Sequence, residues 1–247
     1  MPSRPPRLRL DRLVLERGWA DSRQQAQALI LAGAVRIAGQ GSAKPGQLVA
    51  VDAELERTGP GPRFASRAGD KLEAALHHFQ VGVAGRVALD VGSSTGGFTD
   101  CLLQHGAARV HAVDSGTNQM IWRLRHDPRV HLLERTNARY LTLAQLGEPC
   151  TLLTVDVAFI AARQLLPALA ACLAPPADAI VLVKPQFEAG RAAVGKGGLV
   201  RDPEAQRAAV RLVEDCAHSL GFRVHGVLPS PVLGATGNQE YLLHAVL

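Results

Sequence analysis

The sequence predicts an α/β protein: a doubly wound, Rossmann-like sheet preceded by a small N-terminal α+β domain. First, the aliphatic run at residues 87–91 reads as a buried strand that leads through a glycine-rich turn into an apolar helix. Second, similar runs alternate with helical segments over the rest of the chain, as in parallel α/β sheets. Third, the Pro/Gly stretch at residues 57–63 lacks core-forming side chains and marks a domain boundary.

The first module is predicted to hold two short helices and a β-hairpin. Residues 8–17 have one apolar helical face, and Gly18 ends that helix. Ser22, with Gln three residues later, forms a capping box that opens the second helix. Short alternating runs at residues 35–37 and 47–51 flank a glycine turn, so we expect them to pair as the hairpin.

The positive charge of the chain is concentrated in this module. Residues 1–67 carry 11 Lys and Arg against 6 Asp and Glu, whereas residues 68–247 carry 16 of each. A basic module beside a neutral body is typical of proteins that bind an acidic polymer, because neutralised phosphates release counterions. An ordinary solvated face is the alternative.

The predicted domains are residues 1–56, a linker at 57–65, and residues 66–247. In the larger domain we expect strands at 87–91, 109–113, 130–134, 151–156, 179–184, 222–228 and 240–246. Helices are expected at 97–105, 117–125, 161–173 and 203–220. The connection to the last strand is too short for a crossover helix, so that strand should pair antiparallel.

The glycine turn after the first large-domain strand has the spacing Gly92, Gly96, Gly97. This spacing is not the dinucleotide fingerprint, and no Lys follows as a P-loop requires. Asp90 would repel a pyrophosphate but suits a cofactor with a cationic amino acid end, such as S-adenosylmethionine. Asp114 closes the next strand, where an acid usually binds ribose hydroxyls. A glycine turn without a cofactor is the alternative.

Two charged residues emerge directly from apolar strands: Asp156 and Lys184. A buried unpaired ammonium is costly, so a Lys at this point needs a reason. The chain has only four lysines beside 23 arginines, which suggests that Lys184 serves for its ability to lose a proton. A purely structural Lys184–Asp156 ion pair is the competing interpretation.

Seven stretches together resemble the TlyA family of ribosomal-RNA 2′-O-methyltransferases, long labelled haemolysin-like. The resemblance covers essentially the whole chain, with an S4 RNA-binding domain followed by an FtsJ-like, class I S-adenosylmethionine-dependent methyltransferase domain. The matching stretches are residues 22–26, 66–72, 94–99, 127–130, 134–138, 182–188 and 230–241.

The resemblance implies a catalytic Lys-Asp-Lys-Glu tetrad at Lys71, Asp156, Lys184 and Glu240. Lys184 is expected to take the proton of a ribose 2′-hydroxyl, with Lys71 as a like charge that favours its neutral amine. The expected contacts to S-adenosyl-L-methionine are Asp90, Gly92, Ser93, Ser94, Thr95, Gly96, Phe98, Asp114, Asn137 and Asp156. The expected contacts to RNA are Arg9, Arg12, Ser22, Arg23, Lys44 and Arg67.

The implied substrate is a cytidine of 23S rRNA in ribosomal subunits, with 16S rRNA as a second target in some members. The short stretch after Tyr241 favours large-subunit activity alone. The sequence departs from the family at residues 158–161, where Ala-Phe-Ile-Ala replaces Ser-Phe-Ile-Ser. Two alternatives remain: a non-catalytic S4-type ribosome-assembly protein and a membrane-active haemolysin.

Composition limits the remaining possibilities. No apolar run approaches the ~20 residues of a membrane span, and no secretory signal is visible, so we expect a cytoplasmic protein. The four cysteines lie far apart without a C-x-x-C pair, which indicates free thiols. No metal site is expected, since the adjacent His77 and His78 are interpreted as surface groups. The expected oligomeric state is a monomer.

Overall fold

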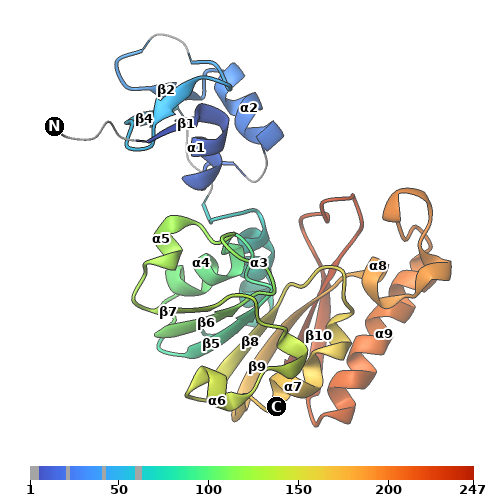
Figure 1. The fold of residues 1–247 in the computed structure, drawn as a ribbon. Coiled ribbons are helices and arrows are strands. Elements are labelled where there is room, and N and C mark those ends of the chain that lie inside the picture. The colour runs from blue at the N-terminus through green and yellow to red at the C-terminus, as the bar shows by residue number, and fades with distance from the viewer. Residues whose placement is uncertain (1–5, 21–22, 41–42, 59–62) are drawn as a thin grey trace.

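The computed structural model describes residues 6–20, 23–40, 43–58 and 63–247, which form an N-terminal region and a larger C-terminal region (Figure 1). Each region has apolar clusters of its own. The elements of the N-terminal region are β1 (Arg7–Arg9), α1 (Leu10–Glu16), α2 (Arg23–Leu31), β2 (Val35–Ile37), β3 (Leu48–Ala50) and β4 (Leu55–Arg57).

Both predicted helices of the N-terminal region are present. Leu10, Leu13 and Val14 of α1 are buried against Ala26 and Ile30 of α2, as their helical spacing predicts. The predicted capping box at Ser22 lies outside the described residues.

The predicted hairpin is wrong. β2 pairs antiparallel with β4, and β3 pairs antiparallel with β1. A pair of three-residue strands makes too few contacts to be stable alone. Which strands pair therefore depends on how their side chains pack in the shared apolar cluster. The expected domain boundaries at residues 56 and 66 stay predictions: β4 runs through Arg57, and Phe64 is already buried in a cluster of the larger region.

The larger region is built on a seven-stranded sheet with the order β10-β11-β9-β8-β5-β6-β7. The strands β5 to β9 run parallel to one another. β11 runs antiparallel to both of its neighbours, β9 and β10, which confirms the predicted late reversal. The strands are β5 (Val87–Val91), β6 (Arg109–Val113), β7 (Val130–Leu133), β8 (Cys150–Val155), β9 (Leu173–Val183), β10 (Arg223–Pro229) and β11 (Tyr241–Val246).

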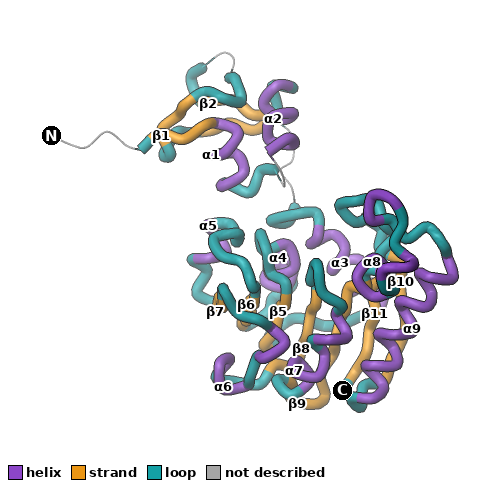
Figure 2. Tube along the Cα trace, turned by 45° about the vertical axis from the view of Figure 1, so that its right-hand side comes forward, coloured by secondary structure: helices purple, strands orange, loops and turns teal. Residues whose placement is uncertain are grey.

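Helices cover both faces of this sheet, as the two views show (Figures 1 and 2). Neighbouring strand residues alternate between the two apolar clusters: Ala88 packs with α3 and α4, whereas Leu89 packs with α7 and α9. Burial on both faces explains the nearly continuous aliphatic runs that predicted the strands. The helices are α3 (Ala68–Phe79), α4 (Gly97–Gln104), α5 (Trp122–Arg125), α6 (Leu143–Leu146), α7 (Leu166–Ala170), α8 (Pro185–Glu188) and α9 (Pro203–Ser219).

Two predicted helices are shorter than expected. The segment 117–125 contains only α5, because Asn118 adopts a left-handed conformation with φ +56° and its amide donates to Glu134 at 2.6 Å. The segment 161–173 divides into a short 3₁₀ turn at Ala162–Gln164 and α7. Pro167 is at the start of α7, where its missing amide hydrogen costs no helical hydrogen bond.

Candidate active site

The carboxyl ends of the parallel strands bring three members of the predicted tetrad to one edge of the sheet. Asp156 follows β8, and Lys184 follows β9. Glu240 precedes the reversed strand β11, whose Tyr241 is paired with Val183 of β9. Antiparallel pairing therefore places Glu240 beside Lys184, although 56 residues separate the two along the chain.

The four tetrad side chains form two ion pairs. Nζ of Lys184 lies 2.6 Å from Oδ1 of Asp156, and both side chains are mostly buried. Lys71, near the start of α3, donates from Nζ to Oε2 of Glu240 at 2.5 Å. The side chains of this second pair are 8% and 3% exposed, so α3 is joined to the sheet by a buried charged contact. Each buried ammonium thus has a carboxylate partner.

Beside the first ion pair lies a cavity of about 630 Å³, a size typical of small-molecule sites. It is bordered by the loops that follow β5, β6, β7 and β8, at the place where doubly wound sheets bind ligands. Five of the predicted cofactor contacts line it: Gly92, Ser94, Asp114, Asn137 and Asp156.

Gly92 is required by the close approach of two strand ends. Its φ is +86°, and a Cβ there would lie 2.3 Å from the carbonyl oxygen of Asp156. No side chain fits in that space. The turn after β5 can therefore pass directly over the end of β8, which brings Asp156 into the wall of the cavity.

Asp114 is held in place by the backbone around it. Oδ2 accepts the amide of Ser94 at 2.8 Å, and Oδ1 accepts the amide of Gly116 at 2.7 Å. Each carboxylate oxygen keeps further lone-pair capacity toward the cavity. The residue is thus oriented for hydroxyl groups of a bound nucleoside, as its position after β6 predicts.

The other five predicted cofactor contacts do not line the cavity. Asp90 is fully buried beneath it, where its carboxylate accepts hydrogen bonds from Thr99 at 2.6 Å and Thr154 at 2.9 Å. Burial raises the pKa of Asp90 to about 6, against the opposing effect of these two hydroxyls. Asp90 thus joins β5 to α4 and β8, and its contact to the cationic end of the cofactor stays a prediction.

The remaining four belong to the packing of the turn. Phe98 is 3% exposed and lies in the apolar cluster under α3 and α4. Gly96 has φ +99° and closely approaches Leu124 of α5. The carbonyl of Thr95 accepts the amide of Ile121 at 3.2 Å. Ser93 is 3% exposed, and its hydroxyl has no partner among the described residues.

Twelve cavity residues were not predicted as contacts, because none carries a charge, and residues 158–161 were noted only as a departure from the family. The most informative is Phe159, a residue that is 93% exposed and whose backbone has φ +66°, a conformation that non-glycine residues rarely adopt. Its ring centroid lies 5.7 Å from that of Phe187 on α8. The other missed residues are Val91, Val113, Ser115, Gly116, Gln119, Thr136, Ala138, Val157, Ala158, Ile160 and Leu165.

In the N-terminal region, two predicted RNA contacts converge on one buried carboxylate. Asp11 is fully buried and accepts from Nε of Arg9 at 3.0 Å and from Nε of Arg23 at 3.0 Å. The hydrogen bond from Arg9 holds the pKa of Asp11 well below its usual range. Both guanidinium groups stay partly exposed, at 44% and 59%, and so face solvent in a fixed orientation.

The other predicted RNA contacts are more loosely held. Lys44 is exposed in the loop before β3. In the same loop, Gly46 lies so close to the guanidinium of Arg9 that an added Cβ would be 3.3 Å from it. Arg12 forms an exposed ion pair with Glu16 one turn later on α1, and Arg67 is exposed at the start of α3. Ser22 lies outside the described residues.

Comparison with known proteins decides the family. The model of the FtsJ-like methyltransferase family matches residues 64–246, and the S4 domain matches residues 8–55. The 16S/23S rRNA (cytidine-2′-O)-methyltransferase TlyA of Mycobacterium tuberculosis is 47% identical over 238 residues, which are 96% of this chain and 89% of that protein. The chain belongs to the TlyA family of FtsJ-like methyltransferases.

Two further relatives carry the older haemolysin label. Hemolysin A of Brachyspira hyodysenteriae is 37% identical over 245 residues, covering 97% of this chain and all of that protein. A solved structure described as a haemolysin from Streptococcus thermophilus shares 40% identity at a TM-score of 0.75, and covers 98% of this chain and 89% of that one. Among the described residues, no helix is both long and apolar enough to cross a membrane.

The family defines the enzyme and its cofactor. This TlyA-family chain is an S-adenosyl-L-methionine-dependent methyltransferase. The cavity fits that cofactor, because its size, its close backbone approach at Gly92 and the oriented carboxylate of Asp114 suit an adenosine group.

Proposed function

We propose that this enzyme methylates the ribose 2′-hydroxyl of a cytidine in 23S rRNA, with 16S rRNA as a second candidate substrate. The observation that carries the proposal is the position of Asp156, which both lines the cofactor-sized cavity and pairs with Lys184 at 2.6 Å. A proton acceptor and a methyl donor would therefore meet at the same point on the sheet edge.

In the proposed reaction the ribose 2′-hydroxyl is the nucleophile. This hydroxyl is a weak acid, so it needs a group that accepts its proton. When bound, S-adenosylmethionine supplies a sulfonium methyl group that is already activated for transfer. Lys184 would accept the proton of the 2′-hydroxyl at Nζ as that oxygen bonds to the methyl carbon, whose bond to sulfur breaks and leaves S-adenosylhomocysteine. Asp156 orients the amine and receives a hydrogen bond from it. Because the methyl group is already activated, the protein accelerates the transfer mainly by accepting the proton and by positioning the reactants.

Lys71 and Glu240 form the second part of the tetrad. Their buried pair fixes α3 against the sheet edge beside Lys184. Lys71 provides a second positive charge there, which would attract the RNA backbone. Glu240 balances Lys71 and is the candidate contact to the substrate ribose. All four side chains come from one chain, so a monomer could form the site.

The RNA substrate is inferred from the S4 domain and from the activity named for the Mycobacterium tuberculosis relative. The exposed ring of Phe159 supports it, since an aromatic face at the rim of the cavity can stack on an unpaired base. Ribosomal RNA as the substrate implies work in the cytoplasm.

The test is methyl transfer from labelled S-adenosylmethionine to purified 50S and 30S subunits and to their naked RNAs. Nuclease digestion and mass spectrometry would identify the modified nucleoside. We expect 2′-O-methylcytidine from the large subunit. Labelling of a base or of protein would contradict the proposal, and RNA binding without any labelling would favour the ribosome-assembly alternative.

A further inference from the structure

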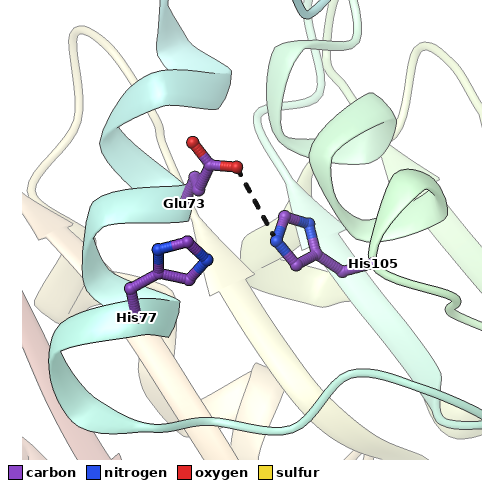
Figure 3. A group of neighbouring side chains, drawn as sticks. All are labelled: Glu73, His77 and His105. Atoms are coloured by element: carbon purple, nitrogen blue, oxygen red, sulfur yellow. Dashed lines mark ion pairs between the residues drawn. The ribbon is translucent and has the colours of Figure 1, made fainter.

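Three side chains outside the cavity form a cluster of metal-ligand type. Glu73 and His77 are one turn apart on α3, and His105 follows the last residue of α4 (Figure 3). One potential ligand atom from each residue lies within 4.8 Å of the other two. His77 is exposed, as predicted for a surface group, and the packing of α3 on α4 places it near the other two residues.

His105 is already arranged as a ligand. Its Nδ1 lies 2.8 Å from the carbonyl oxygen of Cys101, an acceptor, so Nδ1 carries the hydrogen. The lone pair of a neutral ring is then on Nε2, which lies 3.8 Å from Oε1 of Glu73. Metal-binding histidines commonly donate their second nitrogen to a backbone carbonyl in this way.

We propose that Glu73, His77 and His105 bind one divalent transition-metal ion, with Zn²⁺ as the best match and water completing the coordination. Two imidazoles and one carboxylate are an established ligand set for zinc with an open position. Ligands about 2.0–2.1 Å from a tetrahedral ion lie about 3.4 Å apart, so small side-chain rotations would bring the three atoms into place.

Glu73 could exchange its present partner, Arg63, for a metal ion. Its Oε1 also pairs with Arg63, whose side chain is 61% exposed and can withdraw into solvent. Metal binding would release Arg63 and replace one surface cation by another. The buried Cys101 is not part of the cluster; its Sγ lies 3.7 Å from Nδ1 of His105, the ring nitrogen that is not the proposed ligand atom.

The site would join two helices that serve the active site. α3 carries Lys71, and α4 begins directly after the glycine turn that borders the cavity. A metal ion between His77 and His105 would fix the ends of these helices to each other. The inference does not depend on the proposed RNA substrate.

The test is a titration of the untagged full-length protein with Zn²⁺ by calorimetry, with Co²⁺ absorption as a report on coordination. We expect one equivalent to bind, and at least tenfold weaker binding in His77→Ala, Glu73→Gln and His105→Ala. His78→Ala is the matched control, since His78 is the next residue, is also exposed, and packs on Phe79 instead. Because His77 is exposed, its removal should leave the fold intact, as circular dichroism would verify.

Two results would overturn the site. One is the absence of saturable Zn²⁺ binding at micromolar concentrations. The other is equal binding by His77→Ala and His78→Ala, which would indicate an adventitious ion only. Loss of binding in His77→Ala with retention in His78→Ala supports the proposal.

Discussion

At the residue scale, adding a single methyl group at Gly92 should strongly weaken cofactor binding. Gly92→Ala would place a methyl group against the carbonyl of Asp156, and neither backbone can withdraw without disturbing a strand end. We expect at least tenfold weaker binding of S-adenosylmethionine, measured by calorimetry. Gly147→Ala is the control, because Gly147 has a similar φ of +83° but open space around it.

If both alanine variants lose affinity equally, backbone conformation and not the close approach would explain the effect. If neither loses affinity, the turn after β5 does not border the cofactor site.

Asp90 gives a prediction about pH. Its folded-state pKa of about 6 exceeds the unfolded value of about 3.9, so the folded protein binds the proton more tightly. The stability that this proton contributes is complete at low pH and is lost as the pH rises through about 6. Between pH 4.5 and 7.5 the wild type should therefore lose about 2 kcal/mol of unfolding free energy relative to Asp90→Asn. Denaturant titrations of both proteins at the two pH values measure this difference, and a pH-independent difference would contradict it.

Single residues differ in how far the sequence could place them. Asp114 and Asp156 directly follow parallel strands, so the fold alone predicts that they lie at the carboxyl edge of the sheet, where ligands bind. Asp90 lies within a strand, and only the neighbouring hydroxyls of Thr99 and Thr154 show that its carboxylate is enclosed. Phe159 has a conformation that no local sequence signal indicates.

At the scale of elements, a buried ion pair at the start of β11 adds to the apolar packing between α3 and β11. Removing one partner of such a pair leaves an uncompensated charge, so Glu240→Leu should lower the unfolding free energy by about 3 kcal/mol. The double variant Lys71→Met, Glu240→Leu should recover much of that loss, because no charge remains buried. Neither variant should transfer methyl groups at the wild-type rate.

Chemical denaturation and methyl transfer on the same preparations separate the two effects. A stable double variant with full activity would show that the pair is structural only. A single variant as stable as the wild type would show that Lys71 finds another partner.

Helices and strands could be predicted where apolar residues recur with a clear spacing. The pairing of strands that lie far apart in the sequence could not be predicted. The sheet of the larger region follows from its aliphatic runs, and α9 follows from its apolar face. The pairing of β1 with β3 crosses most of the N-terminal region, so no local turn could reveal it. In the segment 117–125, a tertiary contact from Asn118 to Glu134 replaces the first helical turns.

At the scale of the whole molecule, the uneven charge distribution predicts how RNA is bound. Arg23→Ala should weaken RNA binding and reduce the slope of log K against log salt by about 1, because one phosphate contact is lost. Arg207→Ala on α9 removes an equally exposed arginine from the other region and should leave the slope unchanged. Fluorescence anisotropy at several salt concentrations measures both, and equal slopes for the two variants would contradict the role of Arg23.

Single-turnover methyl transfer to ribosomal subunits tests directly whether Lys184 is the proton acceptor. Lys184→Ala should slow transfer by at least about 100-fold while the affinity for S-adenosylmethionine changes less than twofold. Lys196→Ala, which alters an exposed lysine that is not a member of the tetrad, should transfer at the wild-type rate. Transfer by Lys184→Ala at the wild-type rate would contradict the account.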